Sequence, residues 1–180
     1  MSSETFALEK RFSAFANESI YIPRGYEIEA LTTKELQRDY GDKKLTRKDQ
    51  TIYVDEKAAS YLHPDMVNEL MQDIPAGIGW FFHLKQCTFL IYGYYGESQE
   101  IPIKVYKVDW KKNYQYIYSL LCGNKLKLGI TSKHYGITLN AYYPWEKLIH
   151  ENIAEIVWPI EQQTLFPEID FEAEGVLPEV

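Results

Sequence analysis

The segment from Gly41 to Lys57 decides the predicted fold and reads GDKKLTRKDQTIYVDEK. Its second half contains Thr51–Val54, a β-branched and aromatic run that favours a strand. The polar run Arg47–Gln50 separates the two halves and is typical of a turn. We therefore expect a β-hairpin with Lys48 and Asp49 at its apex.

This hairpin register brings charged side chains together. It places Asp42 opposite Asp55, and directly opposed residues have Cβ atoms about 4.5–5.5 Å apart. Asp55 and Lys57 are two residues apart on one strand, so their side chains share a face. Two opposed carboxylates destabilise a sheet unless a cation lies between them. We expect Mg²⁺ (or Mn²⁺) there, with Asp42, Asp55 and the backbone carbonyl of Glu56 as ligands, because magnesium prefers oxygen ligands and keeps several waters.

Such a site is suited to phosphodiester hydrolysis. The metal polarises a phosphate oxygen and acidifies a bound water, and Lys57 can hold that water or stabilise the charged phosphorus centre. An acid from the preceding helix can support the site. We expect Glu9 in this role rather than Glu4, because Glu9 is nearer the helix centre. Asp49 is a rival for the first aspartate, but it lies in the predicted turn and cannot oppose Asp55.

The rest of the chain predicts a mixed α/β domain. Spacing and capping predict helices over about residues 4–17, 33–39, 58–71, 113–121 and 144–157, and strands over about 80–83, 88–95, 101–108 and 126–139. We expect one domain over residues 1–162, with a central mixed sheet flanked by helices. Residues 163–180 alternate Pro, Glu and Gly and are expected to form a loose acidic tail.

These motifs resemble the PD-(D/E)xK nuclease superfamily, in which an Asp begins one strand and (D/E)xK follows on the next. Asp42, then twelve residues, then Asp55-Glu-Lys57 matches that pattern, and Val54-Asp-Glu-Lys-Ala-Ala followed by a helix and Gly79-Trp80 is similar to small phage and bacterial members. The resemblance covers about residues 4–120. It implies a restriction-endonuclease-like core and a metal-dependent nuclease. Gly41 stands where the family often has Pro, and the second acid is Asp, one methylene shorter than Glu.

The distribution of charged residues along the chain indicates what kind of partner the protein binds. Residues 151–180 hold eight acidic residues and no Lys or Arg, so the formal net charge of −7 becomes +1 for residues 1–150. The segment Lys104–Lys133 holds seven lysines and one acid. We expect nucleic acid, DNA before RNA, as the partner, and a homodimer is compatible with the sequence. The residues expected to contact phosphates are Lys107, Lys111, Lys112, Lys125 and Lys127; the alternative is an ordinary solvated face.

Several classes of protein are disfavoured by the sequence. No apolar run reaches the roughly 20 residues of a membrane helix, and the first residues lack the pattern of a signal peptide. Cys87 and Cys122 are too few for a disulfide scaffold and have no zinc-ligand spacing. We therefore expect a cytoplasmic protein with reduced thiols.

Two other functions remain open at this stage. The first is a catalytically silent protein on the same fold that binds nucleic acid or a protein partner, regulated by its acidic tail. The second is a decoy that presents residues 161–180 to a DNA-binding partner.

Overall fold

The fold is a mixed α/β arrangement built around a six-stranded mixed sheet. The computed structural model describes residues 3–72, 77–96, 99–133 and 136–159. The predicted tail 163–180 lies outside these ranges. The first sheet has the strand order β1-β2-β3-β6-β7-β10, in which β3 and β6 are parallel and the other neighbours are antiparallel. Its strands are β1 (Glu27–Ala30), β2 (Lys43–Arg47), β3 (Gln50–Ala59), β6 (Phe89–Tyr94), β7 (Lys104–Asp109) and β10 (Ala154–Trp158).

A second sheet of four strands was not expected from the sequence. Its order is β5-β4-β9-β8, all antiparallel. The strands are β4 (Asp65–Gln72), β5 (Gly77–Ile78), β8 (Lys127–Lys133) and β9 (Gly136–Pro144). The expected strands around 126–139 are thus confirmed as the β8–β9 pair.

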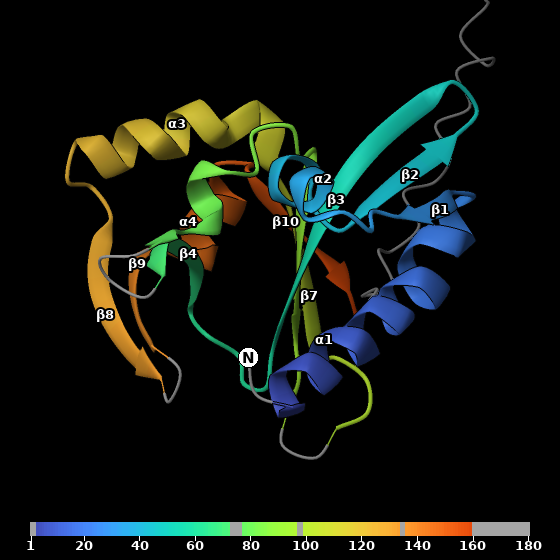
Figure 1. Ribbon diagram of the computed structural model, residues 1–180, viewed down its shortest axis with the longest axis horizontal. Helices are drawn as coiled ribbons and strands as arrows, with labels where there is room; N and C mark the ends of the chain where they lie inside the picture. The colour runs from blue at the N-terminus through green and yellow to red at the C-terminus, as the bar shows by residue number, and fades with distance from the viewer. Residues whose placement is uncertain (1–2, 73–76, 97–98, 134–135, 160–180) are drawn as a thin grey trace, which may run out of the picture.

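Two hydrophobic clusters cover the two faces of the six-stranded sheet. On one face, Phe12, Ala16 and Ile20 from the N-terminal helical region pack on Val54 and Ile91. The other face packs against the second sheet and two helices, in a cluster that includes Met66, Leu90, Trp110, Tyr143 and Trp145. Figure 1 shows α1 (Ser3–Ala16) along one side of the sheet, and α3 (Trp110–Cys122), α4 (Trp145–His150) and the β8–β9 pair on the other.

The helical region at the N-terminus changes its hydrogen bonding as it ends. α1 is followed by a π-helical turn, η1 (Asn17–Tyr21), and a 3₁₀ turn, η2 (Ile22–Arg24), which ends at Gly25 with φ 76°. α2 (Lys34–Tyr40) follows Thr33, whose side chain caps the helix by accepting a hydrogen bond from the N–H of Leu36; the sequence left Thr32 and Thr33 both open as the cap.

The helix expected over residues 58–71 is wrong. β3 continues through Ala58 and Ala59 beside β6, and residues 65–72 form β4. Met66 and Leu70 are both buried, and their even spacing suits a strand. Asn68 between them is buried as well, so burial alternates every second residue.

Two further expectations are corrected. Trp80–Phe82 is a 3₁₀ turn, η3, rather than a strand, with Phe81 buried. The helix expected over 144–157 ends at His150, and Asn152 follows with φ 55°. Residues 154–158 then form β10, which pairs with β7 and becomes the last strand of the six-stranded sheet. No helix in the described ranges is long and apolar enough to span a membrane.

Candidate active site at the β2–β3 fork

The candidate site lies where β2 and β3 separate. The predicted hairpin register is confirmed: Arg47 pairs with Gln50 and Lys43 with Val54. Asp42 comes just before β2, and its N–H donates a 2.8 Å hydrogen bond to the carbonyl of Val54. The next position along β3 is Asp55, so both aspartates lie at the point where the backbone ladder stops.

Asp42 is held by hydrogen bonds to the backbone of β3 and of the residue that follows β1. Its Oδ2 accepts a 2.7 Å hydrogen bond from the N–H of Glu56, and its carbonyl accepts one of 2.8 Å from the N–H of Leu31. The residue before it, Gly41, has φ 98°, and a Cβ there would lie 2.6 Å from the carbonyl oxygen of Val54. Proline fixes φ near −65°, so it cannot occupy this position. The backbone conformation therefore favours glycine at this position.

Asp55 and Lys57 share a face of β3, as predicted, and form an ion pair between Asp55 Oδ2 and Lys57 Nζ. The Asp55 side chain is 7% exposed and that of Lys57 is 30% exposed. The Lys57 ammonium also lies 5.2 Å from the centroid of the Trp80 ring. The Asp55 carboxylate is therefore buried, whereas the Lys57 side chain is partly exposed.

Burial and neighbouring charge shift the acid–base properties of this pair. Burial raises the pKa of Asp55 to about 7; the Lys57 ammonium opposes that rise and the Asp42 carboxylate adds to it. Burial lowers the pKa of Lys57, but the carboxylates of Asp55 and Asp42 outweigh burial and raise it above its usual range. Lys57 is thus a permanent cation here, whereas Asp55 changes charge near neutrality.

The backbone of Glu56 points to the same edge as Asp42. Residues 53 and 59 of β3 use their carbonyls to accept hydrogen bonds from Thr88 and Tyr95 on the β6 side. The N–H and C=O of one strand residue point the same way, and the direction alternates along the strand. Because the N–H of Glu56 reaches Asp42, its carbonyl is directed to the open edge as well.

These donors fit a hard divalent cation. They are two carboxylates and one carbonyl, which leaves room for several waters. Oδ2 of Asp55 is buried, and among the described residues its polar contact is the ion pair with Lys57. Within the described ranges, no group of three or more His, Cys, Asp or Glu side chains could hold a metal ion. The proposed ligand set has two acidic side chains and is completed by the carbonyl.

A cavity of about 620 Å³ lies between α1 and the fork. Glu9 lines it together with Asp42 and Lys57, but Asp55 does not, because its side chain lies on the face of β3 opposite α1. Lys10 from the same helix also lines it.

A second cavity, of about 230 Å³, reaches Asp42 from the other side. Asp42 and Asp55 line it, and Lys34 and Arg38 of α2 supply basic groups. The Nε of Arg38 donates a 3.0 Å hydrogen bond to Nδ1 of His83. The sequence reasoning missed these basic groups, although α2 directly precedes the Asp42 motif.

The structure does not gather the five predicted phosphate-binding lysines into one surface. Lys107 lies on the face of β7 that packs toward α1, where it pairs with Glu155. Lys111 and Lys112 are in the first turn of α3, whereas Lys125 and Lys127 follow its other end. A helix of 13 residues is about 20 Å long, so the two lysine pairs are far apart.

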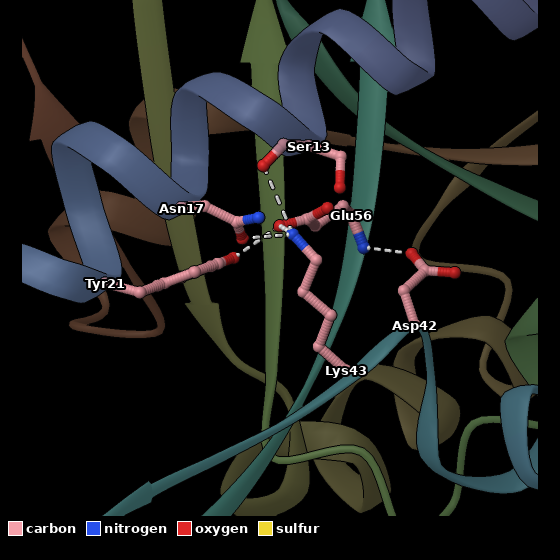
Figure 2. A network of polar contacts seen from close by, with 6 residues as sticks. All are labelled: Ser13, Asn17, Tyr21, Asp42, Lys43 and Glu56. Carbon is pink, nitrogen blue, oxygen red and sulfur yellow. Dashed lines mark hydrogen bonds and ion pairs between the residues drawn. The ribbon is translucent and has the colours of Figure 1, made fainter. Parts of the chain in front are cut away.

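A second polar group, which we call the buried cluster, was also missed. It consists of Lys43, Glu56, Tyr21 and Asn17, on the α1 side of the sheet (Figure 2). Lys43 Nζ lies 2.7 Å from Glu56 Oε1, and the Tyr21 hydroxyl donates a 2.9 Å hydrogen bond to the same oxygen. Burial raises the pKa of Glu56, and Lys43 opposes that rise. The alternation of side chains along β3 could have predicted one part of this cluster, because it places Glu56 on the face opposite Asp55 and Lys57.

No protein-family model, curated protein or solved structure matches this chain.

Proposed function

We propose that the chain is a metal-dependent nuclease of the PD-(D/E)xK kind. The observation that carries the proposal is the meeting of Asp42, Asp55 and Lys57 at the fork between β2 and β3. An N-terminal helix, an Asp at the start of one strand and a DxK on the next also support a restriction-endonuclease-like core. The strand β4 replaces the helix that the resemblance implied after the motif, so the proposal rests on residues 4–57.

The proposed metal ligands are Asp42, Asp55 and the carbonyl of Glu56, with Mg²⁺ or Mn²⁺ as the ion. A bound cation would supply Lewis-acid activation of a phosphate oxygen and would acidify a water. Asp42 is oriented for this role by the Glu56 N–H, and Asp55 is held in a largely buried position.

Lys57 and Glu9 have separate tasks in this proposal. The Lys57 ammonium remains charged and is partly exposed, so it can hold the attacking water or stabilise negative charge on the phosphorus centre. Glu9 lines the cavity that contains Asp42 and Lys57, and it supports the site from α1.

We propose that the nucleic acid approaches over the edge of β3. Asp42 borders both cavities, which open on either side of this edge. Lys34 and Arg38 border one cavity and Lys10 the other, so phosphates on both sides of the cleaved bond would meet a cation. These residues take the role that the sequence suggested for the lysines of 104–133.

A cleavage assay tests the proposal. The wild-type protein is incubated with single- and double-stranded DNA and RNA, with and without Mg²⁺ or Mn²⁺. We expect metal-dependent cleavage of at least one substrate. Asp55→Ala and Lys57→Ala should abolish it while circular dichroism shows folded protein. Full activity in both variants would rule out the mechanism.

A catalytically silent binding protein is the second candidate. The observation that favours it is the ion pair between Lys57 and Asp55, which partly satisfies the site without a metal. Titration with Mn²⁺ separates the two: no binding at millimolar metal favours the silent protein, whose acidic tail would then regulate binding.

A further inference from the structure

The ladder between β2 and β3 ends at Lys43 and Val54, and side chains continue the connection beyond it. On one side of Glu56, its N–H donates to Asp42 Oδ2. On the other side, its carboxylate binds Lys43, the residue next to Asp42 (Figure 2). Asp42 therefore holds the backbone of Glu56, and Lys43 holds the side chain of Glu56.

The buried cluster saturates the hydrogen-bonding capacity of Lys43. An ammonium has three N–H donors. Those of Lys43 reach Glu56 Oε1 at 2.7 Å, Asn17 Oδ1 at 2.6 Å and the Ser13 carbonyl at 3.2 Å. The side chains of Lys43 and Glu56 are each 6% exposed. The cluster thus joins the fork to α1 through side chains that are largely buried.

Such a buried pair is poorly explained by stability alone. Removing two charges from water costs about as much as their attraction returns, and apolar replacements of both partners are often neutral or stabilising. The pair instead gives a fixed geometry. Asn17 is also the first residue of the π-helical turn η1, and such turns are frequent at functional sites.

We infer that Lys43 and Glu56 are positioning residues for the proposed metal site. Glu56 is held from the α1 side by Lys43 and Tyr21, so its N–H and carbonyl keep a fixed direction at the edge of β3. The N–H orients the carboxylate of Asp42, and the carbonyl is the third proposed ligand. The inference rests on the proposed function where it concerns metal binding. The orientation of Asp42 by the Glu56 N–H is measurable without metal.

The test is the double substitution Lys43→Met with Glu56→Leu, which replaces the pair by apolar side chains of similar size. Mn²⁺ binding is followed by calorimetry, and exchange of the residue 56 amide hydrogen by NMR without metal. We expect the Mn²⁺ dissociation constant to rise about 10- to 100-fold. The amide should exchange at least about tenfold faster, since its hydrogen bond to Asp42 is no longer held in place. The urea midpoint should stay at or above that of wild type.

The matched control is Lys44→Met with Glu29→Leu. This pair also joins neighbouring strands at 2.8 Å, but it is exposed and does not contact Glu56. We expect no change in either readout.

The outcomes separate the inference from the proposed function. A folded Lys43→Met/Glu56→Leu protein with wild-type Mn²⁺ affinity and wild-type exchange overturns the inference. A wild-type protein that binds no Mn²⁺ overturns the proposed metal site, and the exchange rate of residue 56 still decides the positioning role. If the double variant does not fold, Tyr21→Phe removes one hydrogen bond to Glu56 and should speed this exchange several-fold; an unchanged rate overturns the inference.

Discussion

Asp55 and Lys57 form an ion pair along one strand, with the carboxylate buried and the ammonium partly exposed. Burial raises the pKa of Asp55 to about 7 even with Lys57 beside it. The charge of the site therefore depends on pH in the neutral range, so the burial of Asp55 can be tested through the pH dependence of protein stability.

The stability of the protein should fall as pH rises from about 4 to about 7. The pKa of Asp55 is about 7 in the folded protein against 3.8 for the free side chain, so the folded state binds this proton more tightly. The protonated carboxyl is tolerated below about pH 4, and the cost of ionising it grows until about pH 7, reaching on the order of 1–4 kcal/mol. Asp55→Asn removes the ionisation, so urea unfolding at about pH 8 should show a more stable variant, with the difference vanishing near pH 4.

Asp49→Asn is the matched control for that measurement. Asp49 is exposed in the turn between β2 and β3. Its substitution should leave the pH dependence of the unfolding free energy unchanged. An Asp55→Asn protein less stable than wild type at about pH 8 would contradict the prediction.

Gly41→Ala should damage the fork. Gly41 has φ 98°, and a Cβ would lie 2.6 Å from the Val54 carbonyl oxygen and 2.8 Å from Asp55 Cβ. The strained backbone and the contact should cost about 1–3 kcal/mol of unfolding free energy and should displace Asp42. Urea unfolding and Mn²⁺ calorimetry measure the two effects. Gly96→Ala is the control, because a Cβ there meets only the flexible side chain of Gln99; equal losses in both variants would speak against a special role for Gly41.

The basic groups on α2 should contribute to nucleic-acid binding. Arg38→Ala and Lys34→Ala each remove one cation beside Asp42 and Asp55. We expect each to weaken binding and to reduce the slope of log affinity against log salt by about 1. Fluorescence anisotropy over a range of salt concentrations measures this slope. Lys125→Ala and Lys127→Ala should leave the slope unchanged. A reduced slope in these two variants, with an unchanged slope in the α2 variants, would contradict the prediction and favour phosphate binding by the lysines of 104–133.

The hairpin was predictable from the sequence because its information is local. The β-branched run at 51–54, the polar turn and the positions of Asp42 and Asp55 fix the register, which the pairing of Lys43 with Val54 confirms. α2 was predictable for the same reason, and so was a threonine cap at residue 32 or 33.

What escaped prediction depends on long-range pairing. Residues 65–72 became a strand because β9 lies beside them, and residues 154–158 because β7 does. The contact of Lys43 with Asn17 joins residues 26 apart in the chain, and that of Arg38 with His83 joins residues 45 apart. Local patterns do not encode such contacts, so the buried cluster and the basic groups beside Asp55 emerged only from the structure.

The central claim is that Asp42 and Asp55 together hold one divalent cation. Calorimetric titration of Mn²⁺ at about pH 8, where Asp55 is ionised, tests it most directly in wild type, Asp42→Asn and Asp55→Asn. The account predicts one ion per wild-type chain and a loss of binding of at least about tenfold in each variant. Absence of binding to the wild type, or unchanged affinity in both variants, would contradict it.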